Sequence, residues 1–81
     1  MPRLRDLSGE QVLDILIDFG YLVAAQDGRH LKVKKSISPG TPKTITFPMM
    51  QDLDKLTLTA IYHEASQYVS EDRLRARFYE R

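Results

Sequence analysis

Two runs of alternating residues flank the segment Gln26-Asp27-Gly28-Arg29, an arrangement typical of a β-hairpin. Asp-Gly favours a type I′ turn, because both central positions of that turn need positive φ. We therefore expect strands over residues 21–26 and 30–35, joined by a turn centred on Asp27 and Gly28. In that register Ala25 faces His30 and Tyr21 faces Lys34.

The expected register separates the hairpin into an apolar face and a polar face, because side chains alternate along a strand. The apolar face would contain Leu22, Ala24, Leu31 and Val33. The other face would contain Tyr21, Val23, Ala25, His30, Lys32 and Lys34. We expect Tyr21 to lie outside near Lys34 and to pack across the strands. An exposed tyrosine at this position could also stack on a nucleic-acid base.

A helix is expected over about residues 8–19, before the hairpin. Ser8 and Gln11 have the spacing of a capping box, and Gly20 is a natural stop after the helix. Its apolar stripe recurs at helical spacing. The stripe consists of Val12, Ile15, Leu16 and Phe19, widened by Leu13 and Ile17.

The second half of the chain predicts a third strand and two more helices. Residues 36–43 contain two prolines and a glycine and are expected to form a loop, after which residues 44–47 alternate with Ile45 and Phe47 inward. A second helix is expected over about residues 54–66, with an apolar stripe of Leu58, Ile61, Tyr62 and Ala65. A short helix is expected to begin after Ser70, anchored by Leu74 and Phe78. The order α-β-β-β-α plus a short C-terminal helix predicts a two-layer α+β domain, with one side of the sheet open to solvent.

The length and composition fit one small cytoplasmic domain. The chain has 81 residues, of which 42% are hydrophobic and 28% charged, and it has no cysteine. A secreted domain of this size would often need disulfides, and cysteine-based metal or redox chemistry is excluded. The first seven residues lack the apolar core of a signal peptide.

The basic residues are concentrated in the middle third of the chain. Residues 28–51 contain no acid and five basic residues, which are Arg29, Lys32, Lys34, Lys35 and Lys43. Such a patch can attract a polyanion such as RNA even though the net charge is only +1. It could also be the charged edge that keeps a sheet soluble.

His30 is the candidate for proton-transfer chemistry. It begins the second strand beside Arg29 and shares a face with Lys32 and Lys34 in the expected register. An imidazole exchanges protons at neutral pH, and nearby cations can stabilise the charge that develops on a phosphate during RNA cleavage. A second acid or base is not evident, so an exposed turn histidine without a role is the alternative. His63 is expected to be a surface or boundary residue, and we expect no metal site and no cofactor.

The ordered set of short motifs resembles the HicA family of toxin–antitoxin toxins over about residues 4–66. We expect residues 1–81 to form a single domain, in which residues 67–81 are a C-terminal helical extension. The segments that carry the resemblance are Leu7-Ser8-Gly9-Glu10-Gln11-Val12, Phe19-Gly20-Tyr21, Gln26-Asp27-Gly28-Arg29-His30-Leu31-Lys32, Thr44-Ile45-Thr46-Phe47-Pro48 and Leu53-Asp54-Lys55-Leu56-Thr57-Leu58.

The resemblance implies a double-stranded-RNA-binding-like fold and an mRNA interferase that cleaves RNA without the ribosome. It implies that His30 is the catalytic histidine, and that a HicB-family antitoxin binds the toxin and covers this site. Together with the charge pattern, it suggests RNA contacts by Arg29, Lys32, Lys34, Lys35 and Lys43.

The chain departs from the family pattern near the expected site. Arg29 stands where the family usually has a small hydroxylated residue, Met49 and Met50 follow Pro48 where a histidine is frequent, and Leu56 replaces a common glycine. Two further functions therefore remain open on the same fold, a non-catalytic RNA-binding module and a domain that only pairs with an antitoxin.

Overall fold

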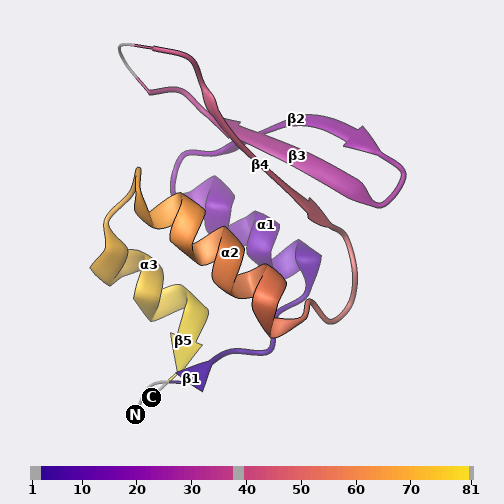
Figure 1. The fold of residues 1–81 in the computed structure, drawn as a ribbon, viewed down its shortest axis with the longest axis vertical. Coiled ribbons are helices and arrows are strands. Elements are labelled where there is room, and N and C mark those ends of the chain that lie inside the picture. Colours follow the sequence, from indigo (N-terminus) through magenta and orange to yellow (C-terminus); the bar gives the residue numbers. More distant parts are fainter. Residues whose placement is uncertain (1–2, 38–39, 81) are drawn as a thin grey trace.

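The computed structural model describes residues 3–37 and 40–80 and has the expected α+β architecture. Figure 1 shows the helices on one side of an antiparallel sheet whose other side is uncovered. The elements in chain order are β1 (Arg3–Leu4), α1 (Gly9–Asp18), β2 (Leu22–Asp27), β3 (His30–Lys35), β4 (Lys43–Pro48), α2 (Lys55–Ser66), α3 (Glu71–Phe78) and β5 (Tyr79–Glu80). The expected loop over residues 36–43 is shortened by the start of β4 at Lys43, and its residues 38 and 39 lie outside the described part of the chain.

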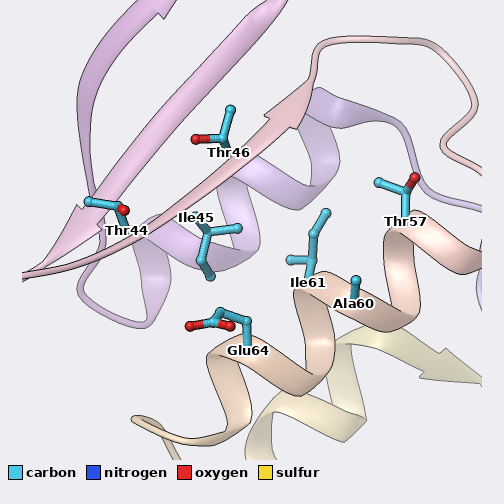
Figure 2. A pocket seen from close by; sticks show the side chains of 7 residues that line it. All are labelled: Thr44, Ile45, Thr46, Thr57, Ala60, Ile61 and Glu64. Carbon is cyan, nitrogen blue, oxygen red and sulfur yellow. The ribbon is translucent and has the colours of Figure 1, made fainter.

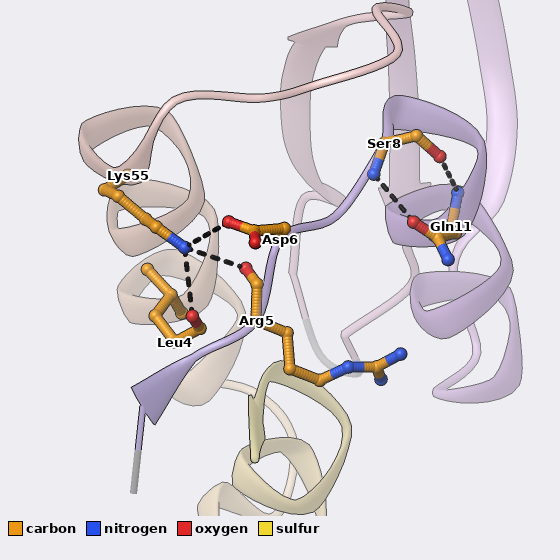
Figure 3. Close-up of polar contacts among 6 residues, drawn as sticks. All are labelled: Leu4, Arg5, Asp6, Ser8, Gln11 and Lys55. Carbon is orange, nitrogen blue, oxygen red and sulfur yellow. Dashed lines mark hydrogen bonds and ion pairs between the residues drawn. The ribbon is translucent and has the colours of Figure 1, made fainter.

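The capping box predicted at the start of α1 is present. The backbone N–H of Gln11 donates to the Ser8 hydroxyl at 3.1 Å, and the backbone N–H of Ser8 donates to the side-chain oxygen of Gln11 at 2.9 Å (Figure 3). Val12, Ile15 and Leu16 are buried as expected, whereas Ile17 is 43% exposed and does not widen the buried stripe.

The C-terminal end of α1 is a Schellman motif that determines where Tyr21 points. Gly20 has φ 97°, its N–H donates to the Ile17 carbonyl, and the Tyr21 N–H donates to the Leu16 carbonyl. This motif brings the residue after the glycine back onto the last turn of the helix, so Tyr21 is fully buried. The expectation that Tyr21 lies outside near Lys34 is therefore wrong.

The hairpin turn lies one residue later than predicted, which shifts the pairing next to the turn by two residues. Asp27 pairs with His30, so Gly28 and Arg29 form the two-residue turn. Only Gly28 has positive φ, at 60°, which is the pattern of a type II′ turn with glycine at its first central position. The sequence allows a type I′ turn at Asp27-Gly28 or a type II′ turn at Gly28-Arg29, and the prediction of the first is wrong.

A β-bulge between Val23 and Ala25 then changes the register again towards the start of β2. Leu22 pairs with Lys34 and Val23 pairs with Val33. Leu22 is 63% exposed and Ala24 is also exposed, so the predicted apolar face of β2 is wrong. β2 is an edge strand that the helices do not cover.

The other two strands alternate as the sequence predicts. Leu31 and Val33 of β3 and Ile45 and Phe47 of β4 are buried against the helices. The strand order β2-β3-β4 makes β3 the central strand of the sheet. The hydrophobic core is therefore anchored on the inner sides of β3 and β4.

The C-terminal segment completes this core. α2 begins after the N-cap Asp54 and buries its predicted stripe, and α3 begins after the N-cap Ser70. Leu74 and Phe78 are fully buried in the same cluster as α1 and the sheet. The strand β5 then pairs with β1, which joins the two ends of the chain (Figure 1).

Replacement of Leu74 tests the contribution of α3 to the core. Leu74→Ala should lower the free energy of unfolding by about 2–5 kcal/mol, because a buried leucine leaves a cavity. Leu56→Ala is the matched control, since Leu56 is helical but 85% exposed, and its effect should stay within about 0.5 kcal/mol. Urea unfolding measures both. Equal effects would show that α3 is not part of the cooperative core.

Tyr21 makes stability depend on pH in the alkaline range. Burial raises the pKa of Tyr21 to about 12, and the nearby charge of Glu64 adds to the effect. A tyrosine in the unfolded chain titrates near about pH 10. The contribution of this group is complete below that pH and is lost as pH rises through the folded pKa.

Between about pH 9 and about pH 11.5, the wild type should therefore lose more unfolding free energy than Tyr21→Phe, which has no hydroxyl to ionise. Urea unfolding at the two pH values measures this difference. A difference that does not change with pH would contradict the buried position of the Tyr21 hydroxyl.

Candidate functional site

The side of the sheet away from the helices forms a polar surface that we call the open face. Residues paired across antiparallel strands share a side, so the register defines its members. The open face consists of Leu22, Ala25 and Asp27 of β2, His30, Lys32 and Lys34 of β3, and Thr44, Thr46 and Pro48 of β4. The predicted grouping of His30, Lys32 and Lys34 on one exposed side is confirmed by the register and by the burial of the residues between them.

The corrected register places a carboxylate beside the candidate histidine. Asp27 is directly opposite His30 across the hairpin, where the prediction had placed Ala25. Paired residues have Cβ atoms about 4.5–5.5 Å apart, within reach of one bound phosphate group. In the described part of the chain the two side chains make no hydrogen bond or ion pair with each other, so both are available to a ligand.

Sequence reasoning assigned Asp27 only to the turn and therefore missed it as a site residue. The signal that could have found it is Gly28-Arg29, because Gly-X is as valid a two-residue hairpin turn as Asp-Gly. Choosing that turn puts Asp27 at the last position of β2 and brings it opposite His30.

The backbone around His30 is held by both neighbouring strands. On the other side of His30 from Asp27 lies Pro48 of β4. Next to this pair, the Met49 N–H donates to the Arg29 carbonyl at 2.6 Å. The turn residue Arg29 is thus fixed through its backbone, while its side chain is exposed to solvent.

Lys32 and Lys34 lie along the open face in the direction away from the turn. They face Thr46 and Thr44 on β4, and all four residues are exposed. Neither ammonium group forms an ion pair within the described residues. The positive charge of this row is therefore available to an anion.

Lys35 and Lys43 belong to the opposite side of the sheet. Lys35 is half-buried, and its Nζ donates to the Phe19 carbonyl at 2.8 Å and lies 5.9 Å from the centre of the Tyr21 ring. Lys43 pairs with Lys35, and its Nζ lies 5.8 Å from the centre of the Tyr68 ring. The structure therefore separates these two lysines from His30, and Lys35 has a structural role at the end of α1.

The arginines of α3 also form contacts with other residues of the protein. Arg77 pairs with Asp18 at 2.9 Å, and Arg75 pairs with Glu71 at 3.1 Å. Arg73 stacks over the ring of Phe19. The contacts of Arg77 and Arg73 join α3 to α1, whereas the Arg75 pair lies within α3.

The second histidine has no comparable setting. His63 is exposed on α2 and contacts the Tyr62 ring edge-on, with the ring centres 5.8 Å apart. Within residues 3–37 and 40–80 no group of three or more His, Cys, Asp or Glu side chains is arranged to hold a metal ion. The arrangement at the open face can bind an anion and offers an imidazole and a carboxylate for proton transfer.

Comparison with protein-family models, with curated proteins and with solved structures found no match for this chain. Among the described helices, none has the length and apolar character needed to cross a bilayer.

Proposed function

We propose that this chain is a metal-independent endoribonuclease of the mRNA interferase type that binds RNA on the open face. The observation that carries the proposal is the pairing of Asp27 with His30 on the same exposed surface as Lys32 and Lys34. This grouping supplies the two kinds of function that RNA cleavage needs, which are proton transfer and positive charge at the phosphate.

The resemblance to the HicA family supports the proposal. The order of α1, β2, β3, β4 and α2 is compatible with the double-stranded-RNA-binding-like fold which that resemblance implies. We propose accordingly that the protein acts in the cytoplasm and is neutralised by a HicB-type antitoxin, which would bind over the open face. An antitoxin in that position would exclude RNA and cover His30 together.

The proposed reaction divides the two proton transfers between His30 and Asp27. One group accepts the proton of the ribose 2′-hydroxyl as its oxygen attacks the phosphorus atom. The other donates a proton to the departing 5′-oxygen. The P–O5′ bond breaks, and the products are a 2′,3′-cyclic phosphate and a free 5′-hydroxyl. Lys32, Lys34 and the exposed side chain of Arg29 stabilise the charge on the phosphate oxygens.

One observation favours the alternative of RNA binding without cleavage. Asp27, Arg29 and His30 are all exposed on an open surface, whereas catalytic groups usually act in a site from which water is excluded. In this alternative the same lysines hold the RNA backbone without sequence preference. A third possibility is a domain that only pairs with the antitoxin, which would bind no RNA.

RNA binding should depend on the lysines of the open face and on salt. Lys32→Ala and Lys34→Ala should each weaken binding to a short RNA and reduce the slope of log K against log salt by roughly 0.7–0.9. Lys43→Ala is the matched control, because it removes the same charge from the other side of the sheet, and it should leave the slope unchanged. Fluorescence anisotropy over a salt series measures all three.

An equal loss for Lys43→Ala and Lys32→Ala would mean that RNA does not bind on the open face. No binding by the wild type even at low salt would favour the antitoxin-pairing domain.

His30→Ala should reduce the rate of RNA cleavage by about 10²–10⁴-fold while binding is retained, because the lost group transfers a proton in the transition state. Asp27→Asn should reduce the rate without loss of binding and tests the second proton-transfer group. His63→Ala is the control and should be without effect. The assay uses purified protein with EDTA present, and end-group analysis identifies the cyclic phosphate and the 5′-hydroxyl.

Cleavage that survives His30→Ala would exclude the catalytic assignment. Binding by the folded wild type without any cleavage would establish the non-catalytic alternative.

A further inference from the structure

The outer edge of β4 carries backbone groups that the sheet does not use. In an antiparallel pair, the residues that exchange hydrogen bonds alternate with residues that do not. The bond from the Met49 N–H to the Arg29 carbonyl fixes this alternation, so Ile45 and Phe47 bond to β3. The N–H and C=O groups of Thr44 and Thr46 therefore point away from β3, and no backbone bond of the described residues occupies them.

A groove of about 390 Å³ runs along this edge, between β4 and α2. Figure 2 shows Ile45 and Ile61 pointing towards each other across it, while the side chains of Thr44 and Thr46 point away from α2. The two threonines thus border the groove with their backbone. Thr57, Ala60 and Glu64 of α2 form the opposite wall.

The groups that border the groove specify the shape of a ligand. Two free N–H and C=O pairs at residues i and i+2 match the backbone of an extended strand. Pro42 and Pro48 limit the edge on its two sides, because proline has no N–H to donate. The edge therefore accepts a short strand, and the apolar floor at Ile45 and Ile61 accepts its alternate side chains.

Glu64 adds a charge preference to this groove. Its side chain forms no ion pair within the described residues, and it lies at the end of the groove below Ile45 (Figure 2). It is half-buried and close enough to Tyr21 for its charge to raise the pKa of that hydroxyl. A half-buried carboxylate without a cation favours a lysine or arginine side chain on the ligand.

We propose that the β4 edge and this groove bind a short extended segment of a partner protein, which adds a strand to the sheet and places a basic side chain against Glu64. The other free edge of the sheet, β2, contains no basic residue and ends in Asp27, so a second copy that docked through β2 would not supply this cation. The bound strand would extend the sheet within the plane of the sheet. It would therefore leave His30 and the open face accessible. This site is independent of the proposed RNA-binding function.

Phage display of a random heptapeptide library on the immobilised full-length protein tests this proposal. The enriched peptides should alternate β-branched and other residues and contain a lysine or arginine. Thr46→Pro removes an N–H that points away from β3 and should weaken binding of a selected peptide by about tenfold or more. Thr46→Val is the matched control, because it keeps that N–H and changes only a side chain outside the groove, and it should bind normally.

Two further measurements test the site even if the proline variant misfolds. Glu64→Gln leaves the edge intact and should weaken binding by about threefold to tenfold, since a hydrogen bond to a charged group is replaced by a neutral one. Amide hydrogen exchange on the wild type should become slower at Thr44 and Thr46 when the selected peptide is added.

Three outcomes would overturn the proposal. The first is that no peptide is enriched, or that the selected peptides bind Thr46→Pro as well as the wild type. The second is that the peptide protects amides of β2 and not those of β4. The third is a concentration-dependent dimer that Thr46→Pro abolishes, which would assign the edge to a second copy of this chain.

Discussion

The alternation of side chains along β3 is the constraint on which both faces of the sheet depend. β3 is the central strand, with Leu31 and Val33 buried against the helices and His30, Lys32 and Lys34 exposed on the other side. Because side chains alternate with a period of two, the same pairing that builds the core also aligns the histidine and the lysines. A register error of one residue in β3 would bury the charges and expose the core at the same time.

Much of the fold could be predicted because local signals agree with the burial pattern. Ser8 and Gln11 predicted the start of α1, and the spacing of Leu58, Ile61, Tyr62 and Ala65 predicted the buried side of α2. The alternation of β3 and β4 predicted their inner residues for the same reason, since both strands have one buried side. The short α3 was also predicted, whereas β1 and β5 are too short to leave a sequence pattern.

The first strand of the hairpin was predicted, but its register was not, because no buried side of the strand fixes the pairing. All six residues of β2 are exposed, so no buried side imposes an alternation, and a bulge further shifts the pairing. The site was affected in two ways. Asp27 moved opposite His30, which supplies the second proton-transfer candidate that the sequence lacked. Lys35, an expected RNA contact, instead lies on the inner side of β3, where its contact with the Phe19 carbonyl holds the end of α1.

RNA binding on the open face can be located directly by a side-chain NMR titration of the labelled protein with a short RNA at low salt. The imidazole signals of His30 and the ammonium-end signals of Lys32 and Lys34 should shift together, whereas those of Lys35 and Lys43 should stay in place. That result would locate RNA on the open face. Shifts confined to Lys35 and Lys43, or no shift at any of these residues, would contradict RNA binding on the open face.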